Sequence, residues 1–255
     1  MRSLAICNSF GAPVFYEETV GSTMDIARVL ADRGEVHGSV IAAGFQEAGR
    51  GRMRERAWNM EREMSLPFTV LLRYPCLEAI PSALTLRTGL ALALAFEDFA
   101  PVLAGTVMIK WPNDIMIGEK KAAGILTEAS GGLVFIGIGV NVAQMEFPVF
   151  LRGKATSIAL AAGISIAQEG RFSLLEKILA RLRGEIEGPA ADWQGRLERR
   201  LYKRGEAVCF AEGAAGSERL VEGRLAGIGP LGELLITPNG ENRERSFVTG
   251  ELRVY

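Results

Sequence analysis

The segment from Val107 to Asn141 contains a lysine and an aspartate that its sequence pattern predicts to lie close together. The segment reads as short apolar strands separated by tight turns, because Pro112-Asn113-Asp114 and Gly118-Glu119 are turn-forming sequences. These turns place Lys121, which enters the third strand, beside Asp114, which precedes the second. A cation and a carboxylate on adjacent rigid strands indicate a site for an anionic group more than a solvated face.

A second group of functional side chains follows a predicted strand at residues 39–43. The run from Gln46 to Trp58 carries four arginines at every other position, with glycines near its start. This pattern fits neither a packed strand face nor a good helix start, so it predicts a mobile loop. Arginine forks suit phosphate and carboxylate. A solvated basic loop is the alternative interpretation, and Trp58 suits either the core or a lid over a ligand. The arginines are Arg50, Arg52, Arg54 and Arg56.

The sequence Gly21-Ser22-Thr23-Met24-Asp25 predicts the start of a helix. Ser22 and Asp25 form a variant of the capping box, and apolar residues follow at helical spacing. In one interpretation Ser22 and Thr23 only cap the helix. In the other, their hydroxyls and the free N–H groups of the helix start bind a polar group of a ligand.

Composition and motifs exclude several classes of protein. The formal net charge of −1 over 255 residues leaves no global footprint for nucleic acid or an anionic membrane. The one histidine, His37, lies in a loop without a nucleophile motif, which argues against a Ser-His-Asp hydrolase and a zinc site. A Walker A motif is absent, and the Gly137-x-Gly139 pattern lacks the third glycine of a dinucleotide site because Val142 takes its place.

The chain also lacks signals for a membrane or an oxidising compartment. No window of about 18 consecutive apolar residues occurs, so we expect no transmembrane helix and no membrane partner. The three cysteines, Cys7, Cys76 and Cys209, are far apart and odd in number. That usage fits free thiols in a reducing cytoplasm.

The remaining pattern predicts an α+β fold in two domains. Strands are expected at 14–18, 39–43 and 64–73, and helices at 81–99, at 156–160, after a Ser173 cap and from Pro189. After Gly205 the pattern changes to five short strands, at 207–210, 219–226, 232–237, 243–248 and 251–254, with Asn239-Gly240 as a type I′ hairpin signal. This predicts a small antiparallel barrel and a boundary near Arg204, which divides the chain into domains 1–204 and 205–255.

Several segments together resemble the biotin protein ligases, the biotin–[acetyl-CoA-carboxylase] ligases. The pair of Lys-Trp-Pro-Asn-Asp and Lys-x-x-Gly-Ile-Leu is highly specific, whereas any one segment alone is weak. The resemblance covers residues 14 to 255 and implies a mixed, largely antiparallel central sheet flanked by helices, followed by an SH3-like C-terminal β-barrel. The matching segments, in the family's order, are Ser22-Thr23, Gln46-x-Ala48-Gly49-Arg50-Gly51-Arg52 with Trp58, Lys110-Trp111-Pro112-Asn113-Asp114, Lys121-x-x-Gly124-Ile125-Leu126-x-Glu128 and Gly137-Ile138-Gly139-Val140-Asn141.

The resemblance implies a ligase that works in two steps. Members of the family make biotinyl-5′-AMP from biotin and Mg-ATP and then pass the biotinyl group to a lysine of a biotin carboxyl carrier protein. Such an enzyme needs a pocket for biotin, a clamp for phosphate and exclusion of water from a labile acyl-adenylate. Biotin, ATP and Mg²⁺ would all be substrates, with Mg²⁺ arriving on ATP and no metal site of the protein itself.

The resemblance also assigns residues to these tasks. The catalytic residues would be Lys121, between the biotin carboxylate and the α-phosphate, Arg52, in the loop that closes over the ligand, and Asp114, which would help to deprotonate the acceptor lysine. Biotin would be bound by Ser22, Thr23, Met24, Gln46, Arg50, Gly51, Arg52, Lys121, Gly124 and Gly137. ATP would be bound by Arg52, Trp58, Lys110, Asn113, Asp114, Lys121 and Asn141.

Two positions depart from the family pattern. The family often continues its loop as Gly-Arg-Gly-Arg-x-Gly-Arg-x-Trp, but here Met53-Arg54-Glu55-Arg56-Ala57 contains no glycine and is one residue longer. How this part of the loop closes is left open. Met24 stands where the family has Asn after Ser-Thr, so any contact there must come from its backbone or its apolar side chain.

The resemblance leaves questions of partners and of substrate. Some members carry an N-terminal winged helix and repress transcription, but residues 1–13 are too few for a helix-turn-helix, so we expect a monofunctional ligase without DNA binding. Sheet-edge homodimers occur in the family, and the oligomeric state is open here. A lipoate or octanoate ligase or transferase shares the fold, and a non-catalytic biotin-sensing module is a third alternative. The Gly-Arg-Gly-Arg loop and the Lys-Trp-Pro-Asn-Asp turn argue against the lipoate-type enzyme, and the Arg50–Arg52 loop together with Lys121 argues against the sensing module.

Overall fold

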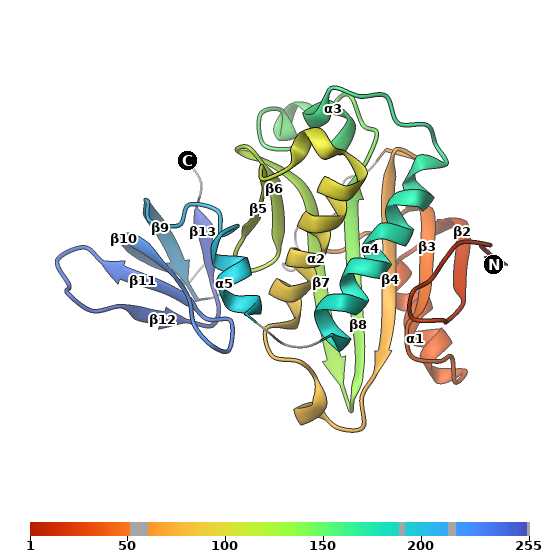
Figure 1. Cartoon of the computed structure of the whole chain (residues 1–255), viewed down its shortest axis with the longest axis horizontal. Coiled ribbons are helices and arrows are strands. Elements are labelled where there is room, and N and C mark those ends of the chain that lie inside the picture. The colour runs from red at the N-terminus through yellow and green to blue at the C-terminus, as the bar shows by residue number, and fades with distance from the viewer. Residues whose placement is uncertain (52–60, 189–191, 214–217, 254–255) are drawn as a thin grey trace.

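The computed structural model describes residues 1–51, 61–188, 192–213 and 218–253 (Figure 1). The first sheet within these residues contains β1 (Arg2–Ser3), β2 (Val14–Val20), β3 (Ser39–Gln46), β4 (Ser65–Arg73), β5 (Val107–Lys110), β6 (Asp114–Ile117), β7 (Lys120–Ser130) and β8 (Leu133–Asn141). The second contains β9 (Ala207–Glu212), β10 (Arg219–Ile228), β11 (Leu234–Pro238), β12 (Arg245–Phe247) and β13 (Glu251–Arg253). The α-helices are α1 (Thr23–Asp32), α2 (Leu84–Phe99), α3 (Ile158–Ala162), α4 (Gly170–Glu187) and α5 (Trp193–Glu198).

The strand order confirms the predicted fold class. The first sheet runs β1-β2-β3-β4-β8-β7-β6-β5, and the second runs β12-β11-β10-β9-β13. Among the described strands, β2 and β3 pair in parallel and the other neighbours pair antiparallel, so the large sheet is mixed. The second sheet is antiparallel throughout, and its five strands fit the predicted SH3-like barrel.

Helices cover both faces of the large sheet (Figure 1). Side chains alternate between the two faces of a strand, so each strand serves both layers. On one face α2 and α4 pack over the strands, while on the other α1 packs through Met24, Ala27 and Leu30 against Ile41 and Leu71. The expected burial of the strand at 64–73 on both faces is confirmed, because Ser65 to Leu72 are all buried.

The segment Leu77–Phe99 is long and apolar enough to cross a membrane by length and mean hydropathy, although its longest unbroken apolar run, Leu90 to Phe96, is far shorter than a membrane span. The structure buries 61% of its most apolar window. Helix α2, which makes up most of this segment, packs on the sheet beside α4 (Figure 1). Burial to this extent inside the protein is typical of a helix in the core of a domain.

Two of the expected helix caps are wrong. Ser22 is the N-cap of α1, but its side chain makes no capping hydrogen bond, so the capping-box interpretation fails. The helix predicted to begin after Ser173 begins at Gly170, because tight turns already form there: Gly170 N–H donates to Ala167 O (2.9 Å) and Phe172 N–H donates to Glu169 O (2.9 Å).

Two further expectations concern the chain near the second sheet. Pro189 lies outside the described residues, and α5 is capped by Asp192, whose side chain accepts from Gly195 N–H (3.1 Å). The type I′ turn predicted at Asn239-Gly240 is wrong, because it needs positive φ at both central residues. Of the two, Gly240 has positive φ (81°), which is the pattern of a type II turn.

The chain segment after α5 pairs with the outer edge of β5. Ile109 N–H donates to Arg200 O (2.7 Å), and Tyr202 N–H donates to Ile109 O (2.9 Å). A second connection comes from the indole N–H of Trp111, which donates to Gly232 O (2.9 Å) in the turn between β10 and β11. The two sheets are therefore joined next to the turn that carries Asn113 and Asp114.

Candidate ligand-binding site

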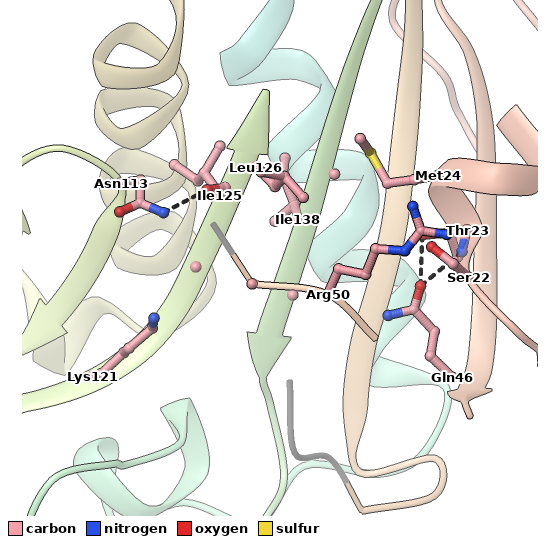
Figure 2. Close-up of a pocket in the computed structure, with 14 residues that line it drawn as sticks. Ser22, Thr23, Met24, Gln46, Arg50, Asn113, Lys121, Ile125, Leu126 and Ile138 are labelled. Carbon is pink, nitrogen blue, oxygen red and sulfur yellow. Dashed lines mark hydrogen bonds between the residues drawn. The ribbon is translucent and has the colours of Figure 1, made fainter. Parts of the chain in front are cut away.

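Glycines create a hollow on the α1 face of the large sheet. Across β7 and β8, Gly124 faces Gly139 and Leu126 faces Gly137. Alternate residues of a strand share one face, so these glycines leave neighbouring positions of that face without side chains. Met24 lies over Gly137: a Cβ added to this glycine would lie 2.7 Å from the Met24 Sδ atom. The result is a pocket beside the start of α1 (Figure 2).

The pocket collects the predicted biotin contacts. Every one of them that the structure describes lines it, and they come from α1, the end of β3, β7 and β8. Arg52 and Trp58 lie outside the described residues, as does the stretch Met53–Ala57. The lining residues are Ser22, Thr23, Met24, Gln46, Arg50, Gly51, Asn113, Lys121, Gly124, Ile125, Leu126, Gly137, Ile138 and Gly139.

One end of the pocket, the neutral end, is formed by uncharged side chains that hydrogen-bond to one another, and the Arg50 side chain lies beside them (Figure 2). The Gln46 Oε1 atom accepts from both the backbone N–H (2.7 Å) and the hydroxyl (2.9 Å) of Thr23. The Thr23 hydroxyl in turn accepts from the hydroxyl of Thr69 (2.9 Å), which is fully buried in β4. Ser22 and Thr23 are themselves buried. Figure 2 shows the Gln46 carbonyl turned towards Thr23 and the amide nitrogen turned away from it.

The other end of the pocket is charged. Lys121 Nζ lies 2.6 Å from Asp114 Oδ1, which confirms the predicted proximity of cation and carboxylate. Asn113 forms two hydrogen bonds with Ile125 of β7. Its side-chain Nδ2 donates to Ile125 O (2.8 Å), and its backbone carbonyl accepts from Ile125 N–H (2.9 Å). Lys110 faces Asp114 across β5 and β6. Asn113 and Lys121 lie on one side of the pocket, and Thr23 and Gln46 lie on the opposite side (Figure 2).

Distant segments hold the charged end in place. The backbone of Lys121 bonds to Lys154 O and to Thr156 N–H, each at 2.9 Å. The Tyr202 hydroxyl donates to the Glu119 carboxylate in the β6–β7 turn. Burial and this hydrogen bond raise the pKa of Tyr202, and the same hydrogen bond is the main cause that lowers the pKa of Glu119.

The predicted nucleotide residues do not all lie in the pocket. Asn113 and Lys121 line it, whereas Lys110, Asp114 and Asn141 do not. Asn141 is buried at the end of β8, and its Nδ2 donates to Thr156 O (3.0 Å), so it holds the segment that also supports Lys121. Its Oδ1 atom is buried and has no hydrogen-bond partner among the residues that the structure describes.

The start of the arginine-rich loop is tied to α1. The Arg50 guanidinium pairs with Asp25, and Arg28 bridges the same carboxylate (2.6 Å) and Glu128. Within the described residues, no group of three or more His, Cys, Asp or Glu side chains could hold a metal ion.

Some residues of the site had no assigned role in the sequence. Ile125, Leu126, Ile138 and Gly139 belong to the motifs but had no ligand contact assigned to them, and Thr69 lies in the buried strand β4. The alternation of Gly137 and Gly139 in β8 is the signal that could have indicated the floor of the pocket. No local pattern points to Thr69.

Comparison with known proteins identifies relatives of the chain. Residues 19–142 match the profile of the biotin/lipoate A/B protein ligase family. The bifunctional ligase/repressor BirA of Bacillus subtilis is 37% identical over 168 residues, which are 63% of this chain and 50% of BirA. The biotin–[acetyl-CoA-carboxylase] ligase of Paracoccus denitrificans is 32% identical over 195 residues, which are 72% of this chain and 79% of that ligase. This chain thus spans half the length of BirA.

A solved structure resembles the whole fold. The biotin protein ligase from Aquifex aeolicus, in complex with biotin and ATP, superposes with a TM-score of 0.75 and 27% sequence identity. The superposition covers 94% of this chain and 97% of that protein.

Proposed function

Because this chain belongs to the biotin/lipoate A/B protein ligase family, we propose that it activates biotin with ATP and transfers the biotinyl group to a lysine of a biotin carboxyl carrier protein. The observation that carries the proposal is the pocket itself. It joins a neutral hydrogen-bonding end, a glycine floor and a cationic end in one hollow. Biotin has the same sequence of parts: a polar ureido head, an apolar ring and tail, and a carboxylate.

The ligand is placed by matching these parts. The ureido head lies among Ser22, Thr23 and Gln46, where buried polar groups already hold one another in position. The ring and tail pass over Gly124 and Gly137, which let the backbone approach closely. The carboxylate then reaches Lys121.

In the first step a biotin carboxylate oxygen attacks the α-phosphorus of Mg-ATP, and the bond to pyrophosphate breaks. Lys121 lies where two anions must meet, so its charge offsets their repulsion and holds them in reach. Lys110, Asn113, Asp114 and Asn141 line the nucleotide side. Arg52 and Trp58, outside the described residues, are proposed to retain the intermediate and to cover adenine.

In the second step the amine of the acceptor lysine attacks the acyl carbon of biotinyl-5′-AMP, and AMP leaves. Asp114 is the proposed acceptor for the proton of that amine, because its Oδ1 atom lies 2.6 Å from Lys121 Nζ, beside the proposed point of attack. No covalent link to the enzyme forms in either step. We also propose that residues 1–204 form the catalytic domain, that 205–255 form the SH3-like domain and that the protein works in the cytoplasm, where its free cysteines stay reduced.

One assay tests the proposal against its alternatives. Purified protein is incubated with ATP and Mg²⁺ and with either biotin or lipoate, and pyrophosphate release and the mass of the adenylate are measured. Biotin-dependent release with a biotinyl-5′-AMP product is the expected result. Release with lipoate in place of biotin would indicate the lipoate-type alternative, and biotin binding without any release would indicate a sensing module.

A further inference from the structure

We propose that Thr69 is a positioning residue that sets the hydroxyl of Thr23 and, through it, the orientation of the Gln46 amide towards the head group of the ligand. The inference rests on the proposed function, because it concerns the same pocket. Thr69 does not line the pocket, so it acts through Thr23 and not by contact with the ligand.

The proton positions in this chain of hydrogen bonds follow from its fixed donor. The Thr23 backbone N–H can only donate, so the Gln46 atom 2.7 Å away must be the carbonyl oxygen. The Thr23 hydroxyl lies 2.9 Å from the same oxygen and donates to it as well. Its lone pairs then accept from Thr69, 2.9 Å away. The Gln46 oxygen is thereby held by Thr23, and the amide nitrogen, a donor, is the end turned away from Thr23 (Figure 2).

The position of Thr69 in the sheet supports a role beyond packing. Its neighbours Phe68 and Val70 point to the α2–α4 core, while Leu71, on the same face as Thr69, packs against α1. Thr69 is fully buried and lies opposite Gly137 in β8. Thr23 therefore hydrogen-bonds to Thr69, and Met24, the next residue, packs against Gly137 on the neighbouring strand.

A valine would fit this buried strand position as well as threonine does, because the two side chains have nearly the same shape. Burial of a hydroxyl costs free energy unless the hydroxyl is hydrogen-bonded. The hydrogen bond to the Thr23 hydroxyl offsets the free energy that burial of the Thr69 hydroxyl costs. Loss of the Thr69 hydroxyl would leave the buried Thr23 oxygen without its donor and free the Thr23 hydroxyl to turn away from Gln46.

The test compares Thr69→Val with Thr69→Ser. The valine variant removes the hydroxyl and keeps the shape, whereas the serine variant keeps the hydroxyl. We expect Thr69→Val to raise both the Kd for biotin, measured by titration calorimetry, and the KM for biotin by about tenfold. The KM for ATP and kcat should stay within about twofold of wild type, and Thr69→Ser should restore biotin affinity. Thr85→Val is the matched control, since it removes a hydroxyl that donates to Thr127 (3.0 Å) away from the pocket.

A double-mutant cycle with Thr23→Val separates positioning from packing. If Thr69 acts through Thr23, Thr69→Val has no further effect on the Kd for biotin once the Thr23 hydroxyl is gone. Wild-type affinity in Thr69→Val, equal damage in Thr69→Ser, or additive effects in the cycle would overturn the inference. If Thr69→Val does not fold, Thr69→Ala and Thr69→Ser give the same comparison.

Calorimetry also keeps this inference separate from the proposed function. A wild-type protein that binds biotin without releasing pyrophosphate would refute the ligase activity, and the Thr69 comparison would still be decided by Kd. A wild-type protein that does not bind biotin at all would overturn both.

Discussion

The two ends of the pocket are built in different ways. The neutral end forms one hydrogen-bonded cluster from Thr23, Gln46 and Thr69, in which both threonines are buried and Gln46 is half-buried. The charged end lies on the hairpin β6–β7, next to the edge strand β5, and there Lys121 is 35% and Asp114 21% exposed. Its supports come from far along the chain, at residues 154–156, 200–202 and 232.

This difference has a physical reason. A neutral head group loses its water when it binds, so the groups that receive it must already be paired and fixed. In the proposed reaction the charged end admits a nucleotide and then an acceptor lysine, which requires that it stays open to solvent. Contacts from the C-terminal part of the chain can hold the hairpin β6–β7 in position while they leave its ligand-facing side accessible to solvent. Changes at the neutral end should therefore act on biotin affinity, and changes at the charged end on the rate of adenylation.

Lys121→Ala should have the largest effect. Loss of the cation where carboxylate and α-phosphate meet is expected to lower the rate of adenylate formation by about 10³-fold, while the protein still folds. Pyrophosphate release and circular dichroism measure the two quantities. Lys120→Ala is the matched control, because Lys120 is the exposed neighbour on the same strand. Wild-type adenylation in Lys121→Ala would remove the charged end from the mechanism.

Gly137→Ala should affect the floor between the two ends. The new Cβ would lie 2.7 Å from the Met24 Sδ atom, so Met24 must move into the pocket or away from it. We expect the KM for biotin to rise about tenfold with little change in kcat, and Met24→Ala in the same chain to recover part of the loss. Gly184→Ala is the control, because a Cβ there meets open space in α4. An unchanged KM would show that the ligand does not pass over Gly137.

Trp111→Phe should test the support from the second sheet. The variant keeps an aromatic ring against Phe210 and loses the hydrogen bond to Gly232 O (2.9 Å). The expected cost is about 1 kcal/mol in the free energy of unfolding, with kcat lowered a few-fold and the KM for biotin unchanged. Urea unfolding and steady-state kinetics measure these effects. A selective rise in the KM for biotin would contradict the division between the two ends.

Glu119→Gln should have the smallest effect, and that effect should depend on pH. The hydrogen bond from Tyr202 lowers the pKa of Glu119, so the folded protein holds the carboxylate ionised more readily than the unfolded chain does. Its stabilising contribution is therefore complete above the unfolded-state pKa of about 4.3 and disappears as the pH falls through the lowered folded-state pKa.

The measurement is the unfolding temperature of wild type and Glu119→Gln at pH 7 and at low pH. We expect a decrease on the order of 1 °C in the variant at pH 7, because the contact is exposed. The difference should vanish once Glu119 is protonated in both states. A difference that grows on acidification would refute the assigned direction of the pKa shift.

Much of the candidate site could be predicted because its motifs are local. The turn sequences around Asp114 and Gly118 bring Lys121 beside Asp114 within a single hairpin, and the structure confirms this. The five strands of the second sheet follow from turn residues at regular spacing. The Ser173 cap failed because hydrogen-bonded turns already start the helix at Gly170, and the type I′ turn failed because Asn239 does not take up positive φ.

Thr69 could not be predicted in the same way. Its role depends on the register of β4 against β8 and on where α1 begins, and these bring residues 23, 69 and 137 together from three separate parts of the chain. The sequence by itself determined the family, the fold class and the chemical types of most residues that line the pocket, because these lie in short motifs with their own turns. Only the tertiary structure decided which side chains contact one another in the pocket and which distant segments support the hairpin β6–β7. The reason is that strand register and pairing at the sheet edge arise from contacts between distant segments, which no local pattern encodes.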